Sequence, residues 1–384
     1  MGESYSCASG GVIVAGRRRY AFDSVAIASD DGNGPYATAG QNIVISLHGS
    51  GGSDTTTGRQ YRAACSGQLA HGDQTQFKFS TLRDYDPLIT LVRPVDTIGT
   101  TTQGIRQTQW MGFIDDVPTG MLLFTEHRLD ALLVWLEANI TNVNHAKRVL
   151  GGGSMGGWGT LSYGIRRVNK FAALYPDRPR WRYGYVIGEI EYQDWATGGH
   201  THTVASSANV ATIDGGGPIF AHHDITSYVA NTANDIPWIG WNVGRQDGFV
   251  NFSDHVDAVV AMRAAKRGFA FAWNNGNHTT GSIQSEIKQS YPYGTFEIGK
   301  GYPLFTNHSG DQDPAVDLVG GINIGLSFRD VVETSSGWSC QVTSVLGART
   351  VTVEPISKVF RAAVTPQNVT IPAANTWVSV SFTA

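Results

Sequence analysis

The feature that most constrains the fold of this 384-residue chain is the string GGGSMGGWG at residues 151–159, in which Ser154 has a glycine two positions before it and two after it. The string follows a short strand candidate, residues 147–150, and it precedes residues 158–168, whose composition suits a helix. A tight turn from strand to helix lifts a serine hydroxyl above a sheet, and a Cβ at the flanking positions would collide with neighbouring backbone. The string therefore predicts a strand, a tight turn and a helix, with Ser154 as a candidate nucleophile.

A chain with 46 glycines can produce such a string by chance, so the flanking segments decide its meaning. Upstream, leucines recur at helical spacing through residues 128–139, and downstream residues 171–175 form another apolar strand candidate. Alternating helix and strand is typical of a parallel α/β sheet. The alternative interpretation is a glycine-rich turn without a catalytic role.

A second glycine-rich loop, HGSGG, follows the apolar strand candidate at residues 42–47. An oxyanion hole in this architecture takes one backbone N–H from such a loop and another from the residue after the nucleophile. The sequence predicts Met155 and Ser50 as the two donors, with Gly49 as the neighbouring alternative. A structural glycine turn after a buried strand is the other interpretation.

Two later strand candidates end in polar loops, in the order acid and then histidine that this architecture requires. Residues 236–243 are followed by GRQDG, which contains Asp247, and residues 269–273 are followed by NNGNH, which ends in His278. Asp247 is expected to hold the tautomer of the histidine. His278 is expected to act as the general base toward Ser154.

Other carboxylates and histidines have simpler explanations. Asp254 and Asp257 lie within a predicted helix over residues 253–266, where solvated or capping roles suffice. The pairs His200/His202 and His222/His223 lack the helical i, i+4 spacing and the third ligand of a zinc site. The sequence therefore predicts neither a metal nor an organic cofactor.

Composition restricts the class of protein. The net charge of −4 gives no basis for binding nucleic acid or an anionic membrane, and no apolar run reaches the roughly 20 residues that span a bilayer. Three widely spaced cysteines form neither a disulfide framework nor a CxxC metal motif. The low charged fraction of 16% favours a secreted protein whose leader is absent from this sequence, with a cytoplasmic protein as the alternative.

Five motifs together resemble the α/β-hydrolase superfamily: LHGSGGS, GGSMGGWG, FAALYPDRPRW, VGRQDGF and FAWNNGNH. Over about residues 11–298 the chain is similar to esterases of this superfamily, namely feruloyl and acetyl-xylan esterases and polyhydroxyalkanoate depolymerases. The resemblance implies the α/β-hydrolase fold, a mostly parallel central sheet flanked by helices, and a triad of Ser154, Asp247 and His278. Residues 182–235 depart from the pattern and are interpreted as an insertion or cap.

The composition changes from about Tyr302 onward, where helical periodicity ends. Short alternating segments separated by Gly, Pro and Asn are typical of an all-β sandwich. The predicted strands are residues 321–328, 339–344, 349–353, 359–364 and 377–382. We therefore predict a catalytic domain over 1–298 and a sandwich-like β domain over 299–384, with a structural role favoured over carbohydrate binding.

The combined hypothesis is a serine carboxylic-ester hydrolase that forms an acyl-enzyme on carbohydrate-linked, feruloyl- or acetyl-type, or polymeric esters. Its expected partner is the ester substrate, such as a polysaccharide or polyester. Trp158, Trp110 and Arg245 are candidates for substrate contacts. Core packing is the alternative for the tryptophans, and a salt bridge within its own loop is the alternative for Arg245. Two other hypotheses are a serine peptidase on the same fold and a non-catalytic carbohydrate-binding module.

Overall fold

The computed structural model describes residues 5–9, 12–15, 18–21, 24–29, 41–47, 89–93, 114–116, 120–122, 124–139, 143–182, 222–281, 283–360 and 362–383. The chain forms two compact units. The first takes its residues from 1–145, 150–166 and 180–225, and the second takes them from 146–149, 167–179 and 226–384. None of the described helices has both the length and the apolarity needed to cross a membrane.

The first unit contains a mixed sheet whose strands lie in the order β1, β4, β6, β5 and β9. Their bounds are β1 Tyr5–Ser9, β4 Ser24–Ser29, β6 Ile89–Arg93, β5 Gln41–Leu47 and β9 Val143–Gly153. Strands β5 and β6 are parallel, whereas β1 and β4 add antiparallel neighbours. Two hairpins accompany the sheet, β2 Val12–Ala15 with β3 Arg18–Ala21, and β7 Ile114–Asp116 with β8 Gly120–Leu122.

Two helices of the first unit, α3 Phe124–Asn139 and α4 Met155–Gly164, show how the sequence pattern becomes packing. The leucines of α3 at helical spacing are all buried, which confirms the predicted apolar stripe, while Val134 on another face is exposed. Helix α4 is buried throughout and packs against β5. Strand β5 is apolar along most of its length, as a strand covered on both faces must be.

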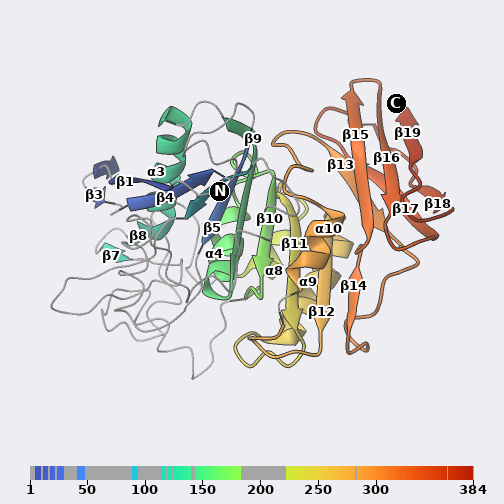
Figure 1. Cartoon of the computed structure of the whole chain (residues 1–384), viewed down its shortest axis with the longest axis horizontal. Coiled ribbons are helices and arrows are strands. Elements are labelled where there is room, and N and C mark those ends of the chain that lie inside the picture. The colour runs from blue at the N-terminus through green and yellow to red at the C-terminus, as the bar shows by residue number, and fades with distance from the viewer. Residues whose placement is uncertain are drawn as a thin grey trace. The chain divides into compact units, whose positions relative to one another are not determined.

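The second unit contains strands in the order β9, β10, β11, β12 and β14. The bounds are β10 Ala173–Asp177, β11 Trp238–Gly244, β12 Phe269–Asn274 and β14 Gly320–Ile322. Strands β10, β11 and β12 run parallel side by side, and β14 is antiparallel to β12 (Figure 1). The helices of this unit are α8 Ile225–Ala230, α9 Phe252–Ala264 and α10 Gln284–Ser290.

Successive side chains of β11 point to opposite faces of the sheet, and a different helix covers each face. Gly240 makes room for α10, because a Cβ there would lie 2.6 Å from Cγ2 of Ile287. The neighbouring Trp241 stacks on Phe271 of β12 at 4.7 Å, and Phe271 stacks in turn on His255 of α9. Helices on both faces of a parallel sheet give the layered α/β architecture that the motifs predicted.

The chain beyond residue 300 forms two antiparallel three-stranded sheets. One sheet has the order β13 Tyr302–Thr306, β17 Arg349–Ile356 and β18 Gln367–Ile371. The other has the order β15 Leu326–Thr334, β16 Gly337–Ser344 and β19 Val378–Thr383. Buried Trp338, Cys340 and Val342 alternate along β16, so one face of this strand is packed and the other is more open. This confirms the predicted β-rich C-terminal region.

Two of the predicted strands need correction. Residues 321–328 do not form one strand, because their ends belong to β14 and β15, which lie in different sheets. Residues 359–364 do not form a strand wherever the structure describes them, because the carboxylate of Glu333 accepts hydrogen bonds from the backbone of Lys358 and Val359 and holds a turn there. Strand β14 lies past residue 298 and yet belongs to the sheet of β12. The exact domain boundary at 298/299 stays a prediction.

Candidate active site

Ser154 lies at the turn where β9 ends and α4 begins, as the sequence predicts. Its backbone has φ +55° and ψ −121°, a conformation that costs a residue with a side chain about 1–3 kcal/mol. The carbonyl of Ser154 accepts the hydrogen bond of Trp158 N at 3.0 Å, which closes the first helical turn. The side chain of Ser154 makes no capping hydrogen bond to α4.

The glycine two positions before Ser154 is required by close backbone contacts. A Cβ at Gly152 would lie 2.5 Å from the carbonyl oxygen of Leu47 at the end of β5, and 2.6 Å from the carbonyl oxygen of Gly156. Both obstacles are backbone atoms that cannot rotate away. At Gly152 the pattern therefore has the steric cause that was predicted for it.

Met155 is the first residue of α4, and its side chain is buried. The N–H groups in the first turn of a helix have no acceptor within the helix, so they suit a developing negative charge. The role of Met155 as an oxyanion donor stays a prediction. The other predicted donors, Ser50 and Gly49, lie outside the described residues, as does Trp110.

Asp247 and His278 meet at the carboxyl edge of the parallel strands in the second unit. Asp247 follows β11 and His278 follows β12, so the topology brings together two residues that are distant in sequence. The distance between Asp247 Oδ2 and His278 Nδ1 is 2.7 Å. The side chain of Asp247 is fully buried, whereas that of His278 is 17% exposed.

The hydrogen bonds of Asp247 define its role. Its Oδ1 accepts from the backbone N–H groups of Phe249 at 2.8 Å and Val250 at 3.2 Å. Because an ionised carboxylate only accepts, the bond on Oδ2 places a hydrogen on Nδ1 of His278. The predicted relation between acid and histidine is therefore present.

Several influences act on the pKa of the Asp247 carboxyl. Burial, the largest influence, raises the pKa, but the hydrogen bond with His278, the two backbone N–H groups and the charge of His278 outweigh it. The net effect lowers the pKa below its usual range. Asp247 is ionised at neutral pH, as stabilisation of an imidazolium requires.

The loops that carry these two residues are bonded to each other through their backbones. Arg245 N donates to Asn274 O at 2.7 Å, and Gln246 N donates to Gly276 O at 2.9 Å. At Gly244 a Cβ would lie only 2.2 Å from the Gly276 carbonyl oxygen, so this position tolerates no side chain. The glycine that opens GRQDG is thus needed for the loops to touch.

One contact to the histidine comes from a residue that the sequence analysis did not single out. Arg178, directly after β10, donates a hydrogen bond from Nη1 to the backbone carbonyl of His278. The sequence feature that could have indicated this contact is the place of Arg178 in the FAALYPDRPRW motif, at the end of the strand next to β11.

The predicted substrate contacts Trp158 and Arg245 have structural partners. The Trp158 ring is buried, and the guanidinium of Arg180 lies 4.4 Å from its centroid. Arg245 donates to the carbonyls of Pro314 at 2.8 Å and Asp317 at 3.0 Å, which anchors the loop before β14. A role of either residue in substrate binding stays a prediction.

The rival residues have other surroundings. Helix α9 is capped by Asn251, and Asp254 lies in its first turn. His222 pairs with Glu126 at 2.8 Å, and burial, the largest influence, lowers the pKa of the adjacent His223 to about 3. Among the residues whose positions are described, no three potential metal ligands cluster.

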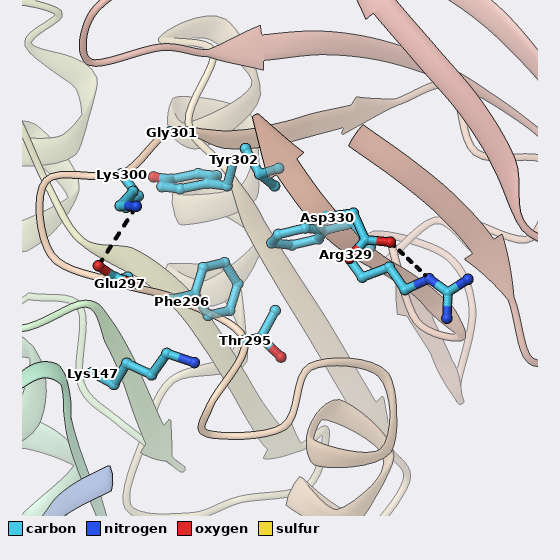
Figure 2. Close-up of a pocket in the computed structure, with 11 residues that line it drawn as sticks. Lys147, Thr295, Phe296, Glu297, Lys300, Gly301, Tyr302, Arg329 and Asp330 are labelled. Atoms are coloured by element: carbon cyan, nitrogen blue, oxygen red, sulfur yellow. Dashed lines mark ion pairs between the residues drawn. The ribbon is translucent and has the colours of Figure 1, made fainter. Parts of the chain in front are cut away.

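A cavity of about 260 Å³ in the second unit is lined by residues that do not include Asp247 or His278. Figure 2 shows its lining residues. Its walls include Phe296, Tyr302 and Lys147. Tyr302 lies beside Gly268, just before β12 begins, whereas His278 follows the other end of that strand. The cavity therefore lies near the amino end of β12, away from Asp247 and His278.

No protein-family model matches the chain, and no curated protein matches it. Solved structures do. The fluorophosphonate-binding serine hydrolase F of Staphylococcus aureus is 14% identical over 72% of this chain and 92% of its own, with a TM-score of 0.44. A ferulic acid esterase is 14% identical over 72% and 92%, with a TM-score of 0.42. A putative dipeptidyl aminopeptidase IV from Bacteroides ovatus is 11% identical over 75% and 35%, with a TM-score of 0.49.

These likenesses agree with the resemblance to α/β-hydrolases that the motifs predicted, and at such scores they carry no argument about activity. The geometry of the chain itself carries the assignment of fold. Parallel strands lie between helices, and a glycine-flanked serine takes the strained turn from β9 into α4. The chain has an α/β-hydrolase fold followed by antiparallel β sheets.

Proposed function

We propose that this protein is a serine hydrolase that cleaves carboxylic esters, with Ser154 as nucleophile, His278 as general base and Asp247 as the orienting carboxylate. The observation that carries the proposal is the backbone of Ser154, φ +55° and ψ −121°, at the start of α4. A strained serine persists where the strain serves chemistry, because a relaxed turn would be more stable. The ionised Asp247 bonded to His278 supports the same proposal.

The proposed reaction has two steps. Ser154 Oγ forms a bond to the ester carbonyl carbon while its proton passes to Nε2 of His278. The oxyanion accepts hydrogen bonds from Met155 N and from the loop of Ser50 and Gly49. The C–O bond to the alcohol then breaks, and the alcohol leaves with the proton from His278. Water then attacks the carbonyl carbon of the acyl-enzyme while its proton passes to His278. The acyl group leaves as the carboxylic acid, and the proton returns to Ser154 Oγ.

For the substrate we propose a carbohydrate-linked or polymeric ester. Phe249 supports a substrate with a flat or apolar group near His278, because the residue is 57% exposed and its ring centroid lies 4.8 Å from that of His278. A large exposed aromatic ring beside a catalytic group suits stacking on a sugar or an aromatic acyl group.

Labelling with a fluorophosphonate tests the proposal directly. The wild-type chain should be labelled at Ser154, and Ser154→Ala should abolish labelling and reduce hydrolysis by several orders of magnitude. The matched control is Ser162→Ala, since Ser162 is a buried serine of the same helix α4. This control should keep both labelling and hydrolysis.

A substrate panel fixes the class of bond. The panel contains acetyl, feruloyl, hydroxyalkanoate and uronate methyl esters together with matching amides. Hydrolysis of esters that depends on Ser154 supports the proposal. Cleavage of amides alone would assign a peptidase instead, and absence of both labelling and hydrolysis in the folded wild type would favour a non-catalytic module.

A further inference from the structure

Arg178 has an unusual backbone for a residue with a long side chain. It lies directly after β10, it is buried, and its φ is +52°. Its N–H donates to the carbonyl oxygen of Asn242 in β11 at 2.8 Å, so the turn is fixed to the neighbouring strand. The left-handed turn is unfavourable for arginine, and a local gain must compensate for it.

The hydrogen bonds of the Arg178 guanidinium provide that gain, and they go to the carboxylate of Asp177 and to the backbone carbonyl of His278. Its Nε and Nη2 donate to Oδ1 and Oδ2 of Asp177 at 3.1 and 3.0 Å, a bidentate pair with a fully buried carboxylate. Its Nη1 donates to the backbone carbonyl of His278. The planar fork of arginine suits this arrangement, because two parallel bonds fix its orientation and leave a third N–H aimed at the carbonyl.

His278 is therefore held at two points, its ring and its backbone. Asp247 fixes the ring through Nδ1, and Arg178 fixes the backbone of the same residue. Hydrogen bonds from Thr279 N and Thr280 N to the side chain of Asn277 shape the turn around it. Of these contacts, only the one from Arg178 ties the His278 carbonyl to β10.

We infer that Arg178, held by Asp177, is a positioning residue that fixes the backbone of the catalytic histidine. The inference rests on the proposed function, in which His278 is the base. It assigns no contact with substrate to Arg178. Its effect is on the orientation of the imidazole, so its loss should lower kcat more than it raises KM.

The first test replaces Arg178 by lysine, which keeps the charge and loses the fork. The matched control is Arg148→Lys, because Arg148 is also buried and also donates to a loop carbonyl, that of Lys170 at 2.8 Å. We expect kcat of Arg178→Lys to fall about 10- to 100-fold below that of the control, with KM within about threefold. Added guanidinium should restore part of the activity of Arg178→Ala.

A spectroscopic readout separates this inference from the proposed function. The Nδ1 proton shared by His278 and Asp247 gives a downfield NMR signal, which should weaken or shift in Arg178→Lys and persist in Arg148→Lys. If the wild type hydrolyses no ester, the proposed function fails while this signal still tests the positioning. An unchanged signal, or a kcat within twofold of the control, overturns the inference. Failure of both Arg178 variants to fold would also overturn it, because the ion pair would then be structural.

Discussion

The second unit contains two Asp–His pairs of nearly equal geometry and very different surroundings. His278 Nδ1 lies 2.7 Å from Asp247, and His308 Nδ1 lies 3.0 Å from Asp311. The side chain of His278 is 17% exposed, whereas that of His308 is 1% exposed. In the described structure, Nε2 of His308 is buried without a hydrogen-bond partner.

The difference between the pairs shows that the same Asp–His contact occurs at a partly exposed position and at a buried one. Asp311 also accepts from Asn323 N at 2.7 Å and from Arg263 at 3.1 Å, so it ties together the segments around β14. Its histidine is three residues away in the same loop, and neither ring nitrogen is open to a substrate. Asp247 and His278 follow two parallel strands, and the side chain of His278 stays partly exposed.

The largest contrast should come from the histidines. We expect His278→Gln to lower kcat by about 10⁶-fold, because the general base is lost, while His308→Gln changes kcat only a few-fold. His308→Gln should instead lower the free energy of unfolding by about 1–3 kcal/mol through its buried hydrogen bond. Initial rates on the best ester and urea unfolding measure both; similar losses of kcat would remove the distinction between the pairs.

The carboxylates should show the same contrast at a smaller size. Asp247→Asn should lower kcat by about 10⁴-fold, since the amide can stabilise the wrong tautomer of His278. Asp311→Asn should destabilise the chain and leave kcat nearly unchanged. Single-turnover rates for the two variants at equal folded fraction test this, and a catalytic defect in Asp311→Asn would contradict it.

The close contact between the two catalytic loops can be tested with two glycines of one loop. Gly244→Ala places a Cβ 2.2 Å from Gly276 O and should displace the histidine loop, which lowers kcat by about 10- to 100-fold. Gly248→Ala meets nothing within 4 Å and should change kcat less than twofold. If both variants behave alike, the contact between the loops is not what places His278.

A third histidine, the buried His255, should affect the pH dependence of stability. Burial lowers the pKa of His255 to about 3 against the attraction of Asp247. Between about pH 6.5 and 3 the unfolded chain binds a proton there that the folded chain does not, so stability is full above this window and falls as the pH falls. His255→Phe should reduce this slope, by at most about 1.4 kcal/mol per pH unit, in urea unfolding between pH 7 and 4. An unchanged slope would exclude His255 as the source.

The sequence predicted the strands of the second unit and the contact between Asp247 and His278 for a physical reason. Each of these two residues follows an apolar strand, and the parallel strands β11 and β12 bring their carboxyl ends to one edge. Long-range contacts were not readable in the same way. The predicted strand 321–328 is divided between β14 and β15, and the pairing of β14 depends on the open edge of β12. The contact of Arg178 depends on a left-handed turn that arginine rarely adopts, and the turn at 357–359 depends on Glu333 from a distant strand.

Strand β14 limits how far this protein can be divided. It lies beyond the β13 strand of the C-terminal sheets, yet its backbone completes the hydrogen bonding of β12, and the loop before it receives Arg245 from the loop that carries Asp247. A chain cut before β14 would leave an unpaired strand edge, a known route to aggregation, directly beside the candidate catalytic groups. A fusion protein that carries the chain only up to residue 298 would therefore carry an open edge at β12 with it.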